Sequence, residues 1–360
     1  MTDDLRRDLV ERLVAHCRHL SVTGQEGTLA DELEQHFRTA GEVVVRVGDS
    51  LVVGEPDGRR PTVALVGHLD VVPPTDDDRD VRVAVHDGDD VVIGRGTSDM
   101  KAGNVIAMAA FEDEQLRADS PYAMVLVLYA REEGAADDNE LADVLAEVTW
   151  LGGVDLAIVL EPTDGEVQVG CLGVINATLS FHGKQAHAAR PWHGDNALTK
   201  AGRFLTEVHD WPAVAVDVDS VRYFDTMAIT QGWTDNPRNV VPALFRLNVN
   251  FRFAPTRGLD AAEAELRTLI GDRADVEIVD RALPAPPRLD AELVQRFIHA
   301  TAATVTAKQA WTDLARFAAL EVAAVNFGPG LTSQAHQRGE YVPVDALVDG
   351  HHRLVAFLRG

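Results

Sequence analysis

Hydrophobic residues follow two periods along the chain, and each period predicts a different element. From Leu5 to Cys17 they recur at helical spacing, which predicts a helix over about residues 4–20. The same reasoning predicts helices over 28–40 and about 102–116. Three runs are continuously apolar, which is typical of strands buried on both faces of a parallel sheet. These runs cover residues 61–68, 122–129 and 154–160, and with the helices they predict an α/β fold whose mixed, largely parallel sheet is flanked by helices.

The pattern changes at about residue 174, where strands of alternating polarity begin. Alternating strands next to helical stretches are typical of a smaller, antiparallel α+β domain. The predicted strands cover 175–181, 227–232 and 244–253, and the predicted helices lie near 196–209 and 259–270.

A proline-rich stretch at 282–287 is typical of a linker that leaves this smaller domain. A strand over 322–327 and a final helix are then expected to rejoin the first sheet. We therefore expect one domain built from residues 1–173 and 285–360, with a second domain, 174–284, inserted into it.

Imidazoles and carboxylates stand at the ends of the apolar runs. In open α/β sheets ligands bind outside the carboxyl ends of the strands, so we expect these side chains to meet in one place. Imidazole and carboxylate groups suit Zn²⁺ and related divalent ions, and five such ligands are more than one tetrahedral ion uses. The pattern predicts a two-metal hydrolase with the site residues His68, Asp70, Asp99, Glu132, Glu133, Glu161 and His336.

Taken singly, these residues also have plainer interpretations. Asp70 lies two residues after His68, on the same side of an extended chain, where it would hold the imidazole in its metal-binding tautomer or simply pair with it. Asp99, taken alone, better fits the N-cap of the helix that follows than a bridging ligand. Glu132 and Glu133 would repel each other at a buried sheet end unless a cation or proton compensates, although a surface salt bridge also explains them. Their shared placement at strand ends favours the metal site.

Composition and charge narrow the class of protein. The chain has 360 residues, 46% of them hydrophobic, which suffices for a full core and two domains. Its formal charge of −24 argues against nucleic acid or an anionic membrane as a partner. No apolar run reaches the roughly 18–20 residues needed to span a membrane, and the charged start lacks the core of a signal peptide. We expect a cytoplasmic enzyme with neither kind of partner.

The cysteines and the remaining polar clusters carry no predicted chemistry. Cys17 and Cys171 are far apart and outside any C-x-x-C pattern, so both are expected to be buried apolar fillers. The acidic clusters 76–80 and 87–90 lack the ligand spacing of an EF-hand and are expected to be solvated loops. Histidines outside the strand-end set, such as His16, are expected at the surface.

Five segments resemble the M20 family of metallopeptidases and occur in its order over nearly the whole chain. They read GHLDVVP, GRGTSDMKAG, AREEG, EPT and AHQRGEYVP. Other segments resemble the succinyl-diaminopimelate desuccinylases within that family, especially their actinobacterial branch. These read CLGVINATLSFHGKQAHAARPWHGDNA, RNVVPA, VNFRFAPTR, WTDLARFAAL and VNFGPG. The resemblance implies a zinc-peptidase-like catalytic domain with an inserted lid and dimerisation domain.

The same resemblance implies how the strand-end residues share two metal ions. Asp99 would bridge the ions, with His68 and Glu161 on one and Glu133 and His336 on the other. The ions would be Zn²⁺, with Co²⁺ or Mn²⁺ as alternatives, because a set of histidines and carboxylates accepts all three.

Catalytic and substrate-binding roles also follow from the resemblance. Glu132 would be the general base, which takes a proton from a water between the metals and passes it to the leaving amine. His187 would enter the site from the second subunit of a homodimer formed through the lid domain. The positions that match substrate contacts are Asn239, Arg252, Thr312 and Arg316.

The substrate that the resemblance implies is a small anionic N-acyl amino acid, N-succinyl-L,L-2,6-diaminopimelate. Acetylornithine deacetylation, aminoacylase and dipeptidase activities stay open, as does a metal-dependent binding protein without catalysis. Two departures bear on the substrate. Cys171-Leu172 stands where many desuccinylases carry an arginine, and Ala310-Trp311 stands where they have a glycine-rich stretch.

Overall fold

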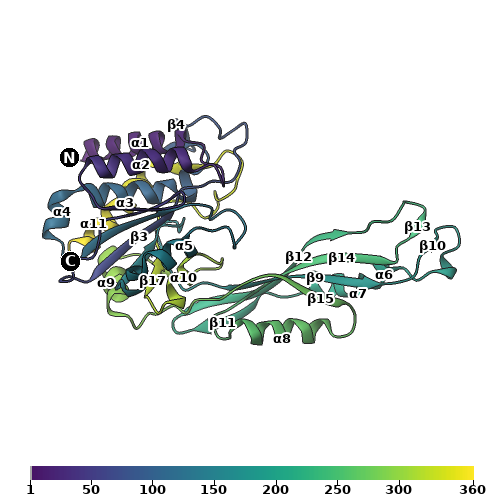
Figure 1. Ribbon diagram of the computed structural model, residues 1–360. Helices are drawn as coiled ribbons and strands as arrows, with labels where there is room; N and C mark the ends of the chain where they lie inside the picture. Colours follow the sequence, from purple (N-terminus) through teal and green to yellow (C-terminus); the bar gives the residue numbers. More distant parts are fainter. Residues whose placement is uncertain (1) are drawn as a thin grey trace. The chain divides into compact units, whose positions relative to one another are not determined.

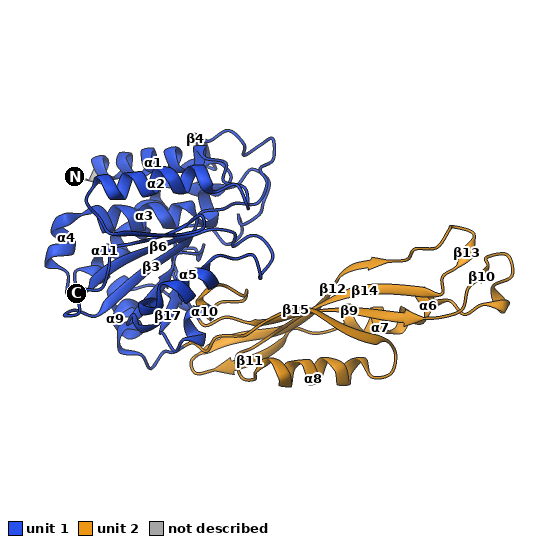
Figure 2. Cartoon of the chain, in the orientation of Figure 1, with its two compact units in different colours: residues 1–169, 288–306, 316–360 blue, residues 170–287, 307–315 orange. Residues whose placement is uncertain are grey.

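The computed structural model describes residues 2–360 and divides the chain into two units (Figure 2). Unit 1 comprises the chain up to Val169 with residues 288–306 and 316–360, and unit 2 comprises residues 170–287 and 307–315. Unit 2 is therefore larger than the insertion 174–284 that the sequence predicts.

Residues 307–315 show why the boundaries differ. The sequence places them in the first domain, whereas the structure binds them to unit 2 by hydrogen bonds. Trp311 Nε1 donates to the carbonyl oxygen of Leu283 at 3.2 Å, and the amide of Phe224 donates to Gln309 Oε1 at 3.1 Å. These partners are distant in sequence, so no local pattern marks the segment as part of unit 2.

The core of unit 1 is an eight-stranded sheet. In spatial order its strands are β1 (Val44–Val47), β2 (Ser50–Val53), β6 (Ala123–Tyr129), β3 (Thr62–His68), β7 (Leu156–Val159), β17 (Ala324–Asn326), β8 (Val167–Val169) and β16 (Val305–Ala307). The central strands β6, β3, β7 and β17 pair in parallel, and β1, β2 and β8 pair antiparallel. Every residue of β3 and β6 is buried, as their continuous apolar runs predict. The predicted mixed, largely parallel α/β fold is confirmed.

Helices cover this sheet on both faces (Figure 1). On one side lie α1 (Thr2–Arg18), α2 (Gly27–Thr39) and α3 (Ala102–Glu112), and α11 (Val344–Leu358) packs against α1, α3 and α9 (Glu292–Thr301). Toward the other side lies α5 (Leu141–Glu147). The short helix α10 (Leu314–Ala319) precedes β17, and a small sheet combines β18 (Tyr341–Pro343), β5 (Asp89–Ile93) and β4 (Arg82–His86).

The helix predicted over 102–116 is wrong in one respect, because it is broken at Asp113. This residue has an extended backbone, with φ −72° and ψ 94°, and so ends α3. Its side chain accepts the amide of Leu116 at 2.9 Å and thereby caps α4 (Glu114–Asp119). One capping residue thus divides an otherwise continuous helical pattern.

The buried residues settle several of the expectations. Cys17 and Cys171 are buried free thiols, as predicted. The prediction that His16 lies at the surface is wrong, because this residue is only 6% exposed and lies on the inner face of α1. Among residues 2–360, no helix has both the length and the apolar character needed to cross a membrane.

Unit 2 is built on a five-stranded antiparallel sheet. Its strands in spatial order are β11 (Val214–Val218), β12 (Val221–Trp233), β14 (Leu244–Phe253), β9 (Gly173–His182) and β15 (Asp275–Ala282). Alternate residues of β14 are buried against α6 (Ala197–Lys200), α7 (Gly202–His209) and α8 (Leu259–Ile270). A separate two-stranded ribbon pairs β10 (Ala186–His187) with β13 (Val240–Val241). One face of the sheet therefore carries the apolar core of this unit.

We predict that His351 on α11 makes stability depend on pH. Burial, with a smaller effect of His352, lowers the pKa of His351 to about 4, whereas a histidine in an unfolded chain titrates near about 6.5. The folded state therefore binds fewer protons over this range, and the free energy of unfolding decreases as pH falls from 6.5 toward 4. After a discount for partial exposure, His351→Gln should remove about 1–2 kcal/mol of that decrease.

Urea unfolding at pH 7.5 and pH 4.5 measures this contribution. His299→Gln, at an exposed position of α9, is the matched control and should retain the wild-type pH dependence. An identical loss of stability in the wild type and His351→Gln would contradict the assignment.

Candidate metal centre

Three predicted ligands converge beyond the carboxyl ends of the parallel strands. His68 ends β3, Asp99 lies in the turn Thr97–Lys101, and Glu133 follows β6. One ligand atom from each lies within 4.8 Å of the others. His68 Nε2 is 3.3 Å from Asp99 Oδ1.

A fourth predicted ligand, His336, arrives from the C-terminal part of the chain. Its Nε2 lies 2.8 Å from Glu133 Oε2 and 3.6 Å from Asp99 Oδ2. The two oxygens of Asp99 therefore face two different imidazoles, His68 and His336. This is the arrangement that a carboxylate shared between two cations requires.

Glu161 is brought to the same end of the sheet by strand register. The parallel pairing of β3 with β7 matches Val66 with Val159, and the amide of Leu160 donates to the carbonyl oxygen of Val66 at 2.8 Å, so Glu161 follows β7 at the sheet edge where His68 ends β3. Glu161 is 7% exposed, so its carboxylate is buried like those of Asp99 and Asp70.

The imidazole of His68 is held in one orientation by its own neighbours. Asn104 Nδ2 donates to the carbonyl oxygen of His68 at 2.7 Å, and the amide of His68 donates to Met100 Sδ at 3.2 Å. The ring nitrogen Nδ1 lies 2.9 Å from the main-chain oxygen of Asp70. A carbonyl oxygen only accepts, so Nδ1 carries the proton and Nε2 is left as the metal ligand.

The carboxylate of Asp70 contacts both His68 and the loop that carries the two acids. Its Oδ1 is 3.6 Å from His68 Nδ1, as the predicted pairing requires, while the Asp70 carbonyl oxygen lies closer to the same nitrogen. Oδ1 also accepts the amide of Glu132 at 2.9 Å, and Oδ2 accepts that of Glu133 at 3.0 Å. Asp70 therefore fixes the loop that carries these two acids. Carboxylates prefer such N–H donors because each bond is charge-assisted.

Glu340 is a site residue that the sequence reasoning missed. Its Oε1 accepts the amides of Ser98 and Asp99 at 2.7 and 3.0 Å, and its Oε2 accepts the amide of Gly96 at 2.9 Å. The turn that carries Asp99 is therefore bound to this carboxylate. The available signal was its place four residues after His336 in AHQRGEYVP.

A buried ion network supports Glu340. Arg95 Nη1 donates to Glu340 Oε2 at 2.9 Å, and Arg95 Nη2 donates to Asp78 Oδ2 at 3.0 Å. Asp78 is fully buried, so the expectation that the whole 76–80 cluster is solvated is wrong at this position. Burial raises the pKa of Glu340 to about 7, against the backbone hydrogen bonds that lower it.

The charge of the cluster fits a divalent cation. Burial alone would lower the pKa of His68, but the hydrogen bond to Asp99 and the charges of Glu132 and Asp70 outweigh it and raise that pKa well above the usual range. The hydrogen bond to Glu133 likewise raises the pKa of His336. The cluster thus favours positive charge, and its nitrogen and oxygen donors suit Zn²⁺, Co²⁺ or Mn²⁺.

The predicted lid and substrate residues divide between the units. Unit 2 holds His187, Asn239, Arg252 and Thr312, and unit 1 holds Arg316.

His187 and Asn239 share the small ribbon of unit 2. His187 pairs with Val240, the residue after Asn239, and the carbonyl oxygen of Asn239 accepts the amide of Ala188 at 2.8 Å. The side chain of His187 is exposed, and its Nδ1 accepts the amide of Ala189 at 3.0 Å.

The two candidate arginines have different surroundings. Arg252 is half-buried on β14 and donates from Nε to Asn250 Oδ1 at 2.9 Å, and burial lowers its pKa. Arg316 Nη2 donates to the carbonyl oxygen of Ala136 at 3.1 Å, in the loop that follows Glu133. This hydrogen bond supports the loop that follows Glu133.

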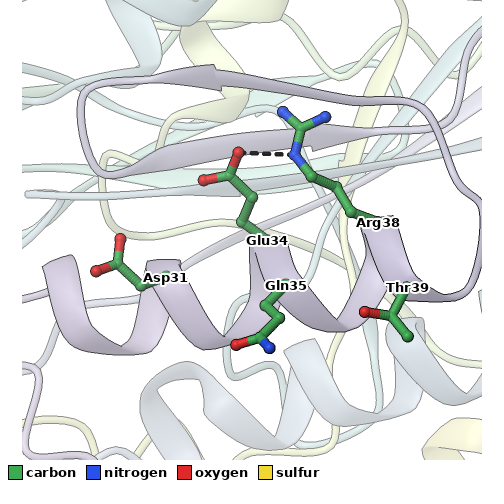
Figure 3. A pocket seen from close by; sticks show the side chains of 5 residues that line it. All are labelled: Asp31, Glu34, Gln35, Arg38 and Thr39. Carbon is green, nitrogen blue, oxygen red and sulfur yellow. Dashed lines mark hydrogen bonds and ion pairs between the residues drawn. The ribbon is translucent and has the colours of Figure 1, made fainter.

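A shallow pocket lies on the outer face of α2, and none of the predicted ligands lines it. Figure 3 shows its lining, in which Glu34 Oε1 pairs with Arg38 Nε at 2.8 Å. The other lining residues are Asp31, Gln35 and Thr39. It contains none of the predicted site residues, and its charged groups are typical of a solvated helix face.

Comparison with known proteins places this geometry in a family. The profile of peptidase family M20/M25/M40 matches residues 64–360. A putative succinyl-diaminopimelate desuccinylase of Mycobacterium tuberculosis is 34% identical over 362 residues, covering 99% of each chain. A succinyl-diaminopimelate desuccinylase of Corynebacterium glutamicum is 35% identical over 338 residues, covering 91% of this chain and 90% of its own.

More distant proteins match in sequence or in structure. An acetylornithine deacetylase of Myxococcus xanthus is 31% identical over 322 residues, covering 85% of this chain and 81% of its own. The crystal structure of aminopeptidase PepT from Bacillus cereus superposes with a TM-score of 0.73 at 20% identity, covering 98% of both chains.

We predict that Glu340→Gln weakens both the fold and the metal centre. An amide has one oxygen for the donors that Glu340 now accepts, and its NH₂ group would face an N–H or the Arg95 guanidinium. The free energy of unfolding should decrease by about 2–4 kcal/mol, because buried donors lose their partners. Urea unfolding and metal analysis after gel filtration measure the two effects.

The control for this variant is Glu147→Gln, which changes an exposed glutamate at the end of α5. It should leave stability and metal retention unchanged. Wild-type metal retention in Glu340→Gln would show that Glu340 does not hold the Asp99 turn in place.

Proposed function

The chain belongs to peptidase family M20/M25/M40, and on that premise we propose that it is a two-metal amidohydrolase acting on N-succinyl-L,L-2,6-diaminopimelate. It would release succinate and L,L-diaminopimelate. Membership makes the chain a metal-dependent amide hydrolase, and the two desuccinylases aligned over at least nine-tenths of its length support the finer assignment. The observation that carries the two-metal proposal is Asp99, whose two oxygens face His68 and His336.

We assign the ligands by this geometry together with the family resemblance. His68 and Glu161 would hold one ion, Glu133 and His336 the other, and Asp99 both. When bound, two divalent ions polarise an amide carbonyl and lower the pKa of a water from about 15.7 toward about 7.

Glu132 is the proposed general base. Its amide is fixed by Asp70 beside the ligand Glu133, so its carboxylate is supplied by the same loop as the metal site. In this role Glu132 accepts a proton from the attacking water and passes it to the leaving amine nitrogen. Proton transfer by a positioned group of this kind typically contributes about 10²–10⁴-fold to the rate.

Residues outside the metal ligands would recognise the substrate. The succinylated substrate carries several carboxylates, which the guanidinium groups of Arg252 and Arg316 suit. Asn239 and Thr312 would add neutral hydrogen bonds, and His187 would stabilise the developing oxyanion from the second subunit of a homodimer.

Acetylornithine deacetylation is the second candidate reaction. It is favoured by the Myxococcus xanthus relative, which aligns over 85% of this chain. The two substrates differ in acyl group and in charge, so rates measured side by side distinguish them.

The proposed function predicts how activity depends on metal and on substrate. Protein freed of metal should be inactive and should regain activity as Zn²⁺ is added, up to two equivalents per chain. N-succinyl-diaminopimelate should be cleaved with a higher kcat/KM than N-acetylornithine. Metal analysis and initial rates on the same samples measure both. Faster deacetylation would favour the second candidate, and full activity at one equivalent would contradict the two-metal proposal.

The second prediction concerns Glu132. Glu132→Gln should bind both ions as the wild type does, because the glutamine leaves the proposed ligands unchanged, but kcat should decrease by about 10²–10⁴-fold, since the amide cannot accept the proton. Metal titration and steady-state kinetics measure these effects. Normal turnover in a variant that holds both ions would refute the role of Glu132.

A further inference from the structure

A buried glutamate outside the metal-binding motifs contacts the catalytic loop. Glu26 precedes α2 and is fully buried. Its Oε1 accepts the amide of Gly24 at 2.9 Å and the amide of Arg131 at 3.2 Å. Among residues 2–360 its Oε2 has no hydrogen-bond partner. Burial of a carboxyl group with one unpaired oxygen costs free energy. The two hydrogen bonds that Oε1 accepts, from Gly24 and Arg131, are the contacts that offset this cost.

Glu26 completes a row of three hydrogen bonds on one stretch of backbone. The amide of Arg131 donates to Glu26, and the next two amides, those of Glu132 and Glu133, donate to Asp70. Thr23 Oγ1 also donates to Asp70 Oδ2 at 2.9 Å. The segment around Thr23 and Glu26 thus supports the loop from one side.

The backbone conformation of Arg131 is one that needs support from surrounding hydrogen bonds. Arg131 has a φ of 64°, in the left-handed region that residues other than glycine rarely adopt. This turn follows β6 directly and sets the direction in which Glu132 leaves the strand. Residues held in sparsely populated conformations persist only when surrounding contacts determine them.

We propose that Glu26 is a positioning residue for catalysis, because its hydrogen bond to the Arg131 amide fixes the left-handed turn that directs the Glu132 carboxylate. The proposal rests on the proposed role of Glu132 as general base. Glu26 would not touch the substrate or the metal ions. It acts through Glu132 alone.

The chemistry of Glu26 predicts which substitutions preserve this role. Burial raises the pKa of Glu26, and the charge of Asp70 raises it further, against backbone hydrogen bonds that lower it. Its Oε1 presents one acceptor oxygen to the two amides. A glutamine presents the same oxygen, an alanine presents none, and an aspartate is one methylene too short to reach Arg131.

The test compares Glu26→Ala, Glu26→Asp and Glu26→Gln in the full-length, metal-loaded enzyme, with the exposed Glu11→Gln as control. The alanine and aspartate variants should lose about 10–100-fold in kcat on the amide that the wild type cleaves best, with KM changed less than about twofold, because a displacement near 1 Å is sufficient for such a loss. Glutamine should restore kcat to within about threefold of the wild type. The control should match the wild type.

Hydrogen exchange gives a second readout that does not depend on turnover. The amides of Arg131, Glu132 and Glu133 should exchange faster in the alanine and aspartate variants and at the wild-type rate in the glutamine variant. If the alanine variant fails to fold, the aspartate and glutamine pair decides between the outcomes.

Two results would overturn the proposal. One is a wild-type kcat in folded Glu26→Asp or Glu26→Ala, which would leave Glu26 with a structural role only. The other is unchanged exchange at residues 131–133 in those variants. A wild-type enzyme that cleaves no amide would instead refute the proposed function, and the exchange measurement would still decide whether Glu26 holds the turn.

Discussion

Several carboxylates lie close together in a buried place, and the rest of the site depends on how the cost of burying them beside one another is offset. Asp70, Asp99 and Glu161 are each less than a tenth exposed, and Glu133 lies beside Asp99. Removing such groups from water is expensive unless opposite charge or N–H donors replace the lost solvation. The raised pKa of His68 reflects the negative charge of the acids around it, and a divalent cation would offset that charge more fully.

The acids of this site divide into two kinds by what they accept. Asp70 and Glu340 accept main-chain amides and so fix the loops on which other acids stand. Asp99 and Glu133 stand on those loops and face imidazoles. Because the oxygens of Asp70 and Glu340 accept main-chain amides, Asp99 and Glu133 are the acids whose oxygens are available to coordinate metal. The parallel sheet makes this division workable, since β3, β6 and β7 deliver their following residues to one edge.

The parts of this molecule that sequence predicts well are those with a local signature. β3 and β6 are continuous apolar runs because both faces are buried, and His68, Glu133 and Glu161 lie near the ends of such runs. Glu340 and Glu26 escaped prediction because they bind amides of loops far away in sequence, and no residue pattern marks the acceptor of a main-chain N–H. The burial of Asp78 has a related cause, since its partner Arg95 lies 17 residues later in the chain and no local pattern links the two. The lid and substrate residues rested on family resemblance, because single exposed histidines and arginines have no local signature.

The discontinuity of unit 1 has a consequence for how the protein is made. Its sheet and ligands begin before Val169, but His336 and Glu340 are synthesised only after unit 2. At about 5–20 residues per second, roughly ten to thirty seconds separate the synthesis of these two parts. Unit 2 is synthesised in between and has its own apolar core. Its first and last segments pair through main-chain hydrogen bonds between Cys171 and Ala285. The set of ligands around Asp99 can therefore be completed only after the segment that carries His336 has been synthesised.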